Sequence, residues 1–228
     1  MLKIGHRGAA GYEPENTLRS FKRALELGVD MIELDVHLCK SGEVVVVHDD
    51  TVGRTTNGSG YVGQKTLTEL RELDAGRGER IPTLPEVLDL IDKRARINIE
   101  LKGPYTALAV SELIEQRVRD MRWGYEDFLI SSFSKSELST FRNRSPNTPI
   151  GLLLHETDIL NLRYRKYAML IGASSIHMPL NLASQRSVNF TKDSGKKVLV
   201  WVVNDPADIE FVKRLGVDGI FSDYPDRL

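Results

Sequence analysis

Two acidic side chains interrupt an otherwise apolar run, Met31-Ile-Glu-Leu-Asp-Val-His37. Successive side chains of a β-strand alternate between its two faces, so Glu33 and Asp35 are predicted to share one face, opposite the apolar residues. Burying two like charges side by side costs several kcal/mol unless a cation or hydrogen bonds offset the repulsion. The pattern favours a metal site; the alternative is that both carboxylates lie on the solvated face of an exposed hairpin.

A return strand is predicted in Val44-Val-Val-Val-His-Asp49, after the turn sequence Lys40-Ser-Gly-Glu43. Gly42 can adopt the positive φ angle that tight turns require. If the turn centres on its Ser-Gly pair, antiparallel pairing places His48 opposite Asp35. Two carboxylates and an imidazole would then share one small volume.

Further polar side chains stand where other predicted strands end. His6 and Arg7 follow the first apolar run, and Glu100 and Lys102 end a strand that begins at Arg96. With Glu100 as a third carboxylate, oxygen-only ligation would select a hard cation, Mg²⁺ or Ca²⁺, over zinc. The two histidines, His6 and His48, are suited to proton transfer near neutral pH as one acid and one base. Arg7 and Lys102 could bind a substrate phosphate beside the metal.

Strand and helix patterns alternate along the chain. Strands are predicted at residues 2–5, 31–37, 96–102, 128–132, 150–154, 174–178, 197–203 and 219–223, in addition to the return strand. Helices are predicted at residues 18–27, 67–73, 84–91, 106–121, 136–143, 160–170, 183–194 and 207–215. Such alternation is typical of a parallel sheet with helical crossovers.

Eight strands in this length predict a closed (β/α)₈ barrel of the TIM type, forming one domain over residues 1–228. The alternative is an open doubly wound sheet. Closure is favoured because polar residues end strands throughout the chain, and only closure brings His6 next to the last strands. Residues 50–83, rich in Gly, Thr and charge, are predicted to form a short insertion after the hairpin, as a cap at the barrel mouth.

The composition limits the classes of partner. Lys and Arg number 31 against 32 Asp and Glu, a formal net charge of -1, so the chain lacks the broad positive field that nucleic acid or an anionic membrane would require. No apolar run approaches the ~20 residues that span a bilayer. The sequence leaves no room for a secretory signal before the first strand, and its single cysteine, Cys39, cannot form an internal disulfide. A cytoplasmic protein without stable membrane association is expected; its oligomeric state is left open.

Beyond these arguments, the order of motifs resembles that of the glycerophosphodiester phosphodiesterases, over residues 4 to 226. The motifs are His6-Arg7-Gly8, Glu15-Asn16-Thr17, Glu33-Leu-Asp35, Val47-His-Asp49 with Arg54-Thr-Thr-Asn-Gly58, Ile99-Glu-Leu-Lys102, Ser131-Ser-Phe133, Trp201-Val-Val-Asn204 and Asp218-Gly-Ile-Phe-Ser-Asp-Tyr-Pro225. Two positions depart from the family pattern: Val202, where Thr is frequent, and Val52-Gly53, where a Leu commonly precedes the Arg. Neither is a proposed ligand.

The resemblance implies a TIM-type barrel that binds one divalent cation. It further implies hydrolysis of small diesters such as glycerophosphocholine and glycerophosphoethanolamine to glycerol 3-phosphate and an alcohol, an activity of lipid and glycerol metabolism. Carried over residue by residue, the metal ligands fall on Glu33, Asp35 and Glu100. The catalytic histidines fall on His6 and His48, and the phosphate-side cations on Arg7 and Lys102. The attacking group would be water or, as the family suggests, the glycerol 2-hydroxyl, which would give a cyclic phosphate.

Several roles stay open at this level. Phe133 and Trp201 are expected to line the glycerol or head-group pocket, with a buried core position as the alternative. His177 is expected to be a hydrogen-bonded structural histidine. Asn16 and Asp49 are candidates for hydrogen bonds that hold the site from behind, although a helix cap would equally explain Asn16. The competing functions are a lysophospholipase D-like reaction on a larger lipid and a non-catalytic barrel that binds a phosphorylated metabolite.

Overall fold

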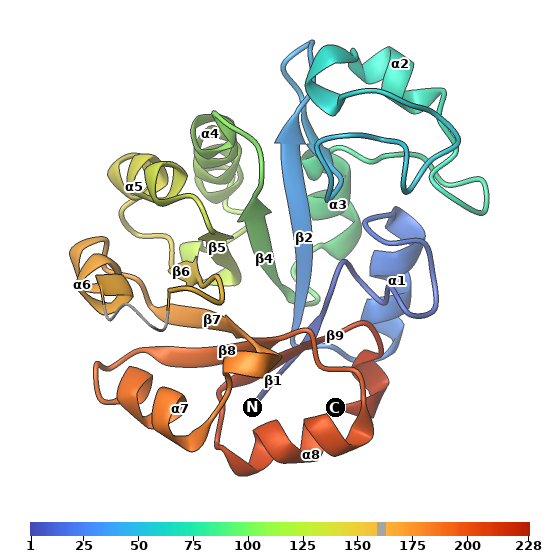
Figure 1. The fold of residues 1–228 in the computed structure, drawn as a ribbon. Helices are drawn as coiled ribbons and strands as arrows, with labels where there is room; N and C mark the ends of the chain where they lie inside the picture. The colour runs from blue at the N-terminus through green and yellow to red at the C-terminus, as the bar shows by residue number, and fades with distance from the viewer. Residues whose placement is uncertain (159–162) are drawn as a thin grey trace.

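The computed structural model describes residues 1–158 and 163–228, which contain one nine-stranded sheet. Eight of these strands follow one another in the parallel order β1-β9-β8-β7-β6-β5-β4-β2, and the pairing of β1 with β2 closes them into a barrel. Strand β3 is the exception, because it pairs antiparallel with β2. Helices surround the barrel strands (Figure 1). The (β/α)₈ prediction is confirmed.

The bounds of the elements agree closely with the sequence patterns. The strands are β1 (Leu2–Gly5), β2 (Met31–Leu38), β3 (Val44–Val46), β4 (Arg96–Leu101), β5 (Phe128–Ser132), β6 (Ile150–Leu153), β7 (Ser175–Pro179), β8 (Lys197–Trp201) and β9 (Gly219–Ser222). The helices are α1 (Leu18–Glu26), α2 (Leu67–Arg71), α3 (Leu84–Ile91), α4 (Thr106–Arg119), α5 (Lys135–Arg144), α6 (Arg163–Leu170), α7 (Gln185–Lys192) and α8 (Pro206–Arg214). The predicted start of the helix at residues 160–170 lies outside the described residues.

The predicted register of the hairpin is wrong by one residue. Strands β2 and β3 pair Val36 with Val46, so the position opposite Asp35 is Val47 and not His48. The Val47 N–H donates to the Asp35 carbonyl at 3.0 Å. Strand β3 ends at Val46, so His48 lies beyond the ladder and is positioned by tertiary contacts.

The loop length explains the shift. The N–H of Cys39 donates to the carbonyl of Glu43 at 3.0 Å, which closes a loop of three residues, 40–42, and not of two. Gly42 takes φ +99°, the left-handed conformation that three-residue hairpin loops place at their last position. The hairpin is therefore centred on Ser41.

Apolar side chains form separate clusters on the two sides of β3. Val44 and Val46 belong to the large core between the barrel strands and the helices. Val45 and Val47 point the other way, into a small core formed with residues of the insertion such as Val52 and Leu70. The insertion at residues 50–83, which carries α2, thus packs on the face of the hairpin that presents Val45 and Val47, beside the end of β2 (Figure 1).

A further cluster fills the inside of the barrel, made of Ile4, Met31, Leu129, Leu199 and Phe221. The barrel axis is therefore a packed core. Inward-facing polar side chains can gather only beyond it, toward the C-terminal ends of the strands, which is where barrels of this type place their active sites.

Candidate active site

Three buried carboxylates meet at the C-terminal ends of β2 and β4. Asp35 and Glu100 are direct neighbours in the parallel register of these strands, and Glu33 precedes Asp35 by two residues on the same face. One oxygen from each of the three lies within 4.8 Å of the others. The predicted alternation is confirmed, since Ile32, Leu34 and Val36 face the core between strands and helices.

Nearby cations neutralise these carboxylates only in part. The backbone N–H of Arg7 donates to Glu33 Oε2 at 2.8 Å, and its side-chain Nε lies 3.4 Å from Asp35 Oδ2. Lys102 Nζ donates to Glu100 Oε1 at 2.9 Å. Two side-chain cations thus face three buried acids. Burial and the neighbouring carboxylates raise the pKa of Glu33 well above its usual range.

The pKa of Glu100 is also raised, to about 7, by burial first and then by the charge of Asp35. When all three acids are ionised, they carry one more negative charge than Arg7 and Lys102 neutralise. Its donors are carboxylate oxygens alone, the ligand type of Mg²⁺ and Ca²⁺. By charge and by donor chemistry the three residues fit a divalent cation.

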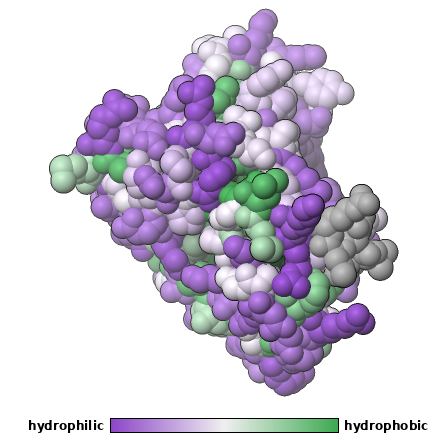
Figure 2. All heavy atoms as spheres, turned by 90° about the vertical axis from the view of Figure 1, so that its left-hand side faces the viewer, coloured by the Kyte–Doolittle hydropathy of each residue, from purple (hydrophilic) through white to green (hydrophobic). Residues whose placement is uncertain are grey.

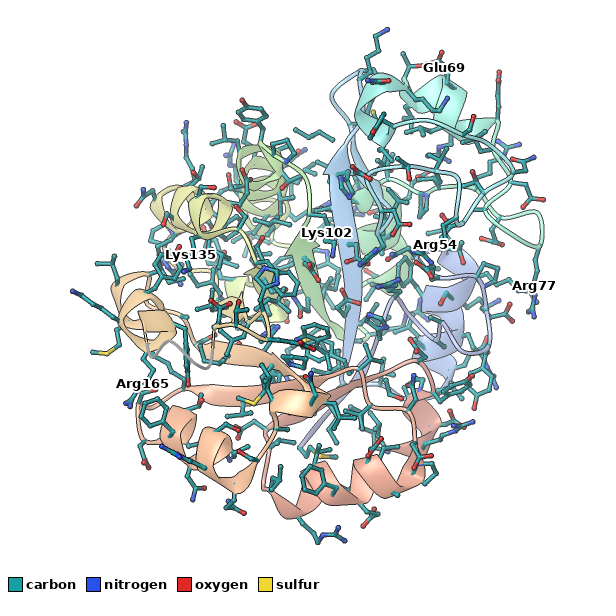
Figure 3. The ribbon with its side chains drawn as sticks, viewed as in Figure 1. Arg54, Glu69, Arg77, Lys102, Lys135 and Arg165 are labelled. Carbon is teal, nitrogen blue, oxygen red and sulfur yellow. The ribbon has the colours of Figure 1, made fainter. Side chains whose placement is uncertain are left out.

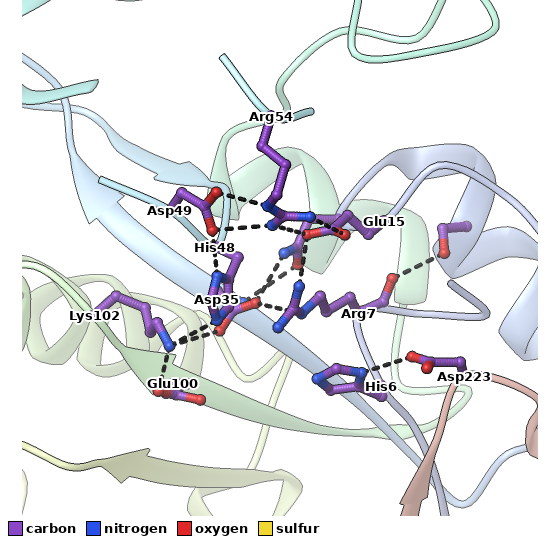
Figure 4. A network of polar contacts seen from close by, with 12 residues as sticks. His6, Arg7, Glu15, Asp35, His48, Asp49, Arg54, Glu100, Lys102 and Asp223 are labelled. Atoms are coloured by element: carbon purple, nitrogen blue, oxygen red, sulfur yellow. Dashed lines mark hydrogen bonds and ion pairs between the residues drawn. The ribbon is translucent and has the colours of Figure 1, made fainter. Parts of the chain in front are cut away.

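His48 is held between a carboxylate and an ammonium group. Its Nδ1 lies 2.6 Å from Asp49 Oδ1, and its Nε2 lies 3.0 Å from Lys102 Nζ (Figure 4). An ammonium group can only donate, so Nε2 accepts and the ring proton sits on Nδ1, facing Asp49. Burial lowers the pKa of His48, and Arg7 and Lys102 lower it further against the opposite effect of Asp35 and Asp49. The ring is therefore neutral, and the Nε2 lone pair that could take a proton accepts a hydrogen bond from Lys102.

His6 lies at the end of β1 and is held by the last strand of the barrel. Its Nδ1 donates to Asp223 Oδ1 at 2.7 Å, and Asn204 Nδ2 donates to the other oxygen of that carboxylate at 2.6 Å. Asn204 Oδ1 in turn accepts from the backbone N–H of Asp223 at 2.9 Å. This chain of hydrogen bonds fixes the imidazole plane and leaves the second ring nitrogen of His6 free for a substrate.

A cavity with about 470 Å³ of empty space, its open mouth included, connects these groups. All of the catalytic, metal-ligand and substrate-contact residues predicted from sequence line it except Asp35, of which 1% of the surface is exposed. The predicted lining residues are His6, Arg7, Glu33, His48, Glu100, Lys102, Phe133 and Trp201, and the structure adds Asn98, Ser131, Leu153, His177, Val202 and Phe221. Lys102 lies at the centre of the molecule in Figure 3.

Aromatic side chains form one wall of the cavity. The rings of Phe133 and Trp201 meet edge to face with centroids 5.8 Å apart, and His155 stacks on Phe133 at 4.3 Å. Trp201 Nε1 is buried without a hydrogen-bond partner among residues 1–158 and 163–228. Lys102 Nζ lies 5.9 Å from the Phe133 centroid. This wall therefore offers one unused donor together with apolar surface.

His177 is buried and is among the residues that line the cavity. Its Nε2 lies 2.9 Å from Ser175 Oγ, and burial lowers its pKa to about 3. A ring that stays neutral across the physiological range cannot act as the acid of a reaction at neutral pH. These observations agree with the structural role expected from the sequence.

The sequence left open whether Asn16 caps the first helix or holds the site by hydrogen bonds. Thr17 caps α1, since its hydroxyl accepts from the Ser20 N–H at 3.2 Å. Asn16 takes φ +57° and turns its side chain toward the carboxylates, where Nδ2 donates to Asp35 Oδ2 at 2.9 Å. The amide of Asn16 thus helps to orient a proposed metal ligand.

Sequence reasoning missed the charged groups behind the site. In the sequence, Asp223, Glu15 and Arg54 stand out only as parts of motifs. Glu15 accepts from Arg7 Nη1 at 2.8 Å and from Arg54 Nη1 at 2.8 Å. A carboxylate directly before the first helix, two residues ahead of its N-cap, was the available signal for Glu15.

Comparison with known proteins gives consistent results. Residues 6–227 match the model of the glycerophosphoryl diester phosphodiesterase family. The chain is 40% identical over 236 residues to a glycerophosphodiester phosphodiesterase of Caldanaerobacter subterraneus subsp. tengcongensis, covering 100% of this chain and 96% of that protein. It is 34% identical over 252 residues to a Bacillus subtilis protein of the same name, covering 99% and 84%.

A solved structure has the same fold. It is an Oleispira antarctica phosphodiesterase in complex with the product sn-glycerol-3-phosphate, similar with a TM-score of 0.90 and 31% identity. The alignment covers 98% of this chain and 93% of that one. The likeness thus extends over nearly the whole of both chains.

Proposed function

The chain belongs to the glycerophosphoryl diester phosphodiesterase family, and on that premise we propose that it hydrolyses small glycerophosphodiesters to sn-glycerol 3-phosphate and an alcohol. Glycerophosphoethanolamine and glycerophosphocholine are the expected substrates. The observation that carries this proposal is the convergence of three buried carboxylates and two carboxylate-bound histidines on one cavity.

Glu33, Asp35 and Glu100 are the proposed ligands of one divalent cation, Mg²⁺ or Ca²⁺. When bound, such a cation withdraws charge from a phosphate oxygen and orients the diester. The uncompensated charge of the three acids supports this assignment. Asn16 and the backbone N–H of Arg7 keep two of the carboxylates in place.

His48 is the proposed general base. Its Nε2 carries the lone pair that can take the proton of the attacking hydroxyl group, while Asp49 stabilises the imidazolium that forms. As the oxygen of the attacking group bonds to phosphorus, the bond from phosphorus to the head-group oxygen breaks. His6, whose Nδ1 proton is held by Asp223, donates its Nε2 proton to that departing oxygen. Water would be the attacker in direct hydrolysis, and the glycerol 2-hydroxyl in a route through a cyclic phosphate.

Arg7 and Lys102 are the proposed phosphate-binding cations. Both line the cavity, and their proximity to the acids keeps them charged: although burial alone lowers the pKa of Lys102, Glu100 and Asp35 raise it above its usual value. Phe133 and Trp201 are proposed to contact the glycerol or head-group part of the substrate. The unused Trp201 N–H supports a hydrogen bond to a substrate oxygen.

We further propose that residues 1–228 form one catalytic domain and that the insertion at residues 50–83 caps the barrel mouth. Its ion pairs with the loop between β1 and α1, which carries Arg7, support this placement. A cytoplasmic location is proposed because Cys39 is a free, buried thiol, as a reducing compartment favours. No helix within the described residues combines the length and apolarity that crossing a bilayer requires.

A comparison of two substrates that differ only in an acyl chain tests the substrate class. We expect kcat/KM for glycerophosphoethanolamine to exceed that for lysophosphatidylethanolamine by at least about tenfold, or ~1.4 kcal/mol of transition-state stabilisation. The cavity holds about 470 Å³ with its open mouth included, and on the face shown in Figure 2 hydrophobic residues form small areas among hydrophilic ones. The measurement is phosphorus NMR of product release from each substrate below its micellar concentration. A preference for the acylated substrate would contradict the proposal and favour the lysophospholipase D-like reaction.

A further inference from the structure

Arg54, in the first turn of the insertion, directs its whole guanidinium group at two carboxylates. Nε and Nη2 donate to the two oxygens of Asp49, at 2.7 and 3.0 Å. Nη1 and Nη2 donate to the two oxygens of Glu15, at 2.8 and 2.7 Å. Paired hydrogen bonds of this kind fix the orientation of both partners as well as their distance, which a point charge such as lysine cannot do.

Both carboxylates also contact residues of the proposed site. Asp49 Oδ1, one of the atoms that Arg54 holds, is the partner of His48 Nδ1 at 2.6 Å. Glu15 Oε1, another of them, is the partner of Arg7 Nη1 at 2.8 Å. Figure 4 shows this arrangement: the guanidinium of Arg54 contacts the two carboxylates that hold His48 and Arg7.

Arg54 does not line the cavity, and its donors face Asp49 and Glu15. It can therefore influence the reaction only through those partners. We propose that Arg54 is a positioning residue, which sets the ring of His48 through Asp49 and the guanidinium of Arg7 through Glu15. The proposal rests on the proposed function insofar as it concerns the rate of hydrolysis. It makes the insertion part of the active-site framework.

A second ion pair between the same two segments provides the matched control. Arg77, also in the insertion, pairs with Glu13, whose other partner is Arg19 on α1. Arg77 thus joins the insertion to the loop after β1, as Arg54 does, but through a carboxylate whose partners are all surface arginines. In Figure 3 Arg77 lies at the outer edge of the molecule, and Arg54 lies nearer the barrel. If joining the insertion to this loop were all that Arg54 contributed, Arg77→Ala would lower the activity as well.

The test compares Arg54→Ala, Arg54→Lys and Arg77→Ala in the full chain, with metal present. Removal of a residue that orients metal ligands from behind typically costs 10- to 100-fold in activity, and we expect a fall in kcat/KM of similar size in both Arg54 variants. Because His48 and Arg7 are both affected, kcat should fall and KM should rise. Arg77→Ala should stay within about twofold of the parent protein, as expected for an exposed pair.

Further readouts separate positioning from stability. Millimolar guanidinium ion should restore part of the activity of Arg54→Ala but not that of Arg54→Lys, whose side chain fills the site. In an Asp49→Asn background the Arg54→Ala change should cost much less than in the parent, since the two residues act on one ring. Equal effects of Arg54→Ala and Arg77→Ala, or additivity with no rescue, would overturn the proposal.

The positioning of the ring can also be read without catalysis. In ¹H–¹⁵N NMR spectra that detect imidazole groups, the Nδ1 proton of His48 should be observable in the parent protein and in Arg77→Ala, and lost to solvent exchange in Arg54→Ala. An unchanged signal in Arg54→Ala would overturn the proposal. If the parent released no glycerol 3-phosphate, the proposed function would fail, yet this spectrum would still decide whether Arg54 orders His48.

Discussion

Replacing His48 by glutamine is expected to lower kcat for glycerophosphoethanolamine by about 10²- to 10⁴-fold, the usual contribution of a positioned general base. The neutral ring presents Nε2 as an acceptor, with its proton on the Asp49 side. Glutamine keeps a polar side chain of similar reach but cannot accept a proton. Single-turnover rates measured at saturating metal give the value.

The companion variant His6→Gln distinguishes the two histidines. It should lose a similar factor on glycerophosphoethanolamine, because the departing alkoxide then receives no proton. On a p-nitrophenyl diester of glycerol phosphate, whose leaving group needs no proton, His6→Gln should keep most of its activity and His48→Gln should not. The opposite pattern would exchange the two roles, and near-normal rates for both variants on both substrates would refute histidine catalysis.

Replacing Glu33 by glutamine is expected to have opposite effects on activity and on stability. Loss of one of three ligands should reduce metal-dependent turnover by about 10³-fold, since metal-ion stabilisation of transition-state charge is worth several kcal/mol. The metal-free protein should become more stable, because the change removes one of three buried carboxylates that repel one another, and each pKa unit of such repulsion is worth about 1.4 kcal/mol. For a chain of this size that is a rise in Tm of about 2–4 °C per kcal/mol.

The pH dependence of that gain follows from the sign of the pKa shifts. Glu33 and Glu100 have pKa values raised in the folded protein, so between the unfolded and folded values the folded state binds more protons. For Glu100 that window runs from about 4.5 to about 7, and there metal-free stability is lost as pH rises. The Tm advantage of Glu33→Gln should thus be larger at pH 8 than at pH 5.

An acid whose pKa is lowered in the folded protein, and not raised, provides the control for this effect. Glu43 lies at the hairpin loop, where hydrogen bonds from Ser41 and Cys39 lower its pKa. Glu43→Gln should therefore leave turnover unchanged and should not raise the Tm of the metal-free protein at any pH. A metal-free Glu33→Gln protein that melts below the parent at pH 8 would contradict the view that the cluster is strained without a cation.

The sequence could predict the parts of the site that follow from strand geometry. Alternation along a strand placed Glu33 and Asp35 on one face, and the rule that parallel strands end at one rim brought Glu100 to them. The helix predicted at residues 18–27 is likewise a local feature. Such features depend on residues that lie close together in the sequence, so the local pattern of apolar and polar residues predicts them.

What the sequence could not supply depends on contacts between distant segments or on loop geometry. The partner of His6 is Asp223, 217 residues away. The Arg54–Glu15 pair joins segments 39 residues apart, and nothing in the local pattern distinguishes it from a surface ion pair. The hairpin register failed because a two-residue and a three-residue loop are equally compatible with a Ser-Gly pair, and they differ by one position along the return strand.

The most direct test of the account is release of glycerol 3-phosphate from glycerophosphoethanolamine by metal-stripped protein, with Mg²⁺, Ca²⁺ and Mn²⁺ added back singly. We predict no release from the stripped protein and restoration by at least one ion, with Glu33→Gln failing to respond at the same ion concentration. No release with any ion from folded protein, or release that metal removal leaves unchanged, would contradict the assignment of Glu33, Asp35 and Glu100 as the metal site of a glycerophosphodiester phosphodiesterase.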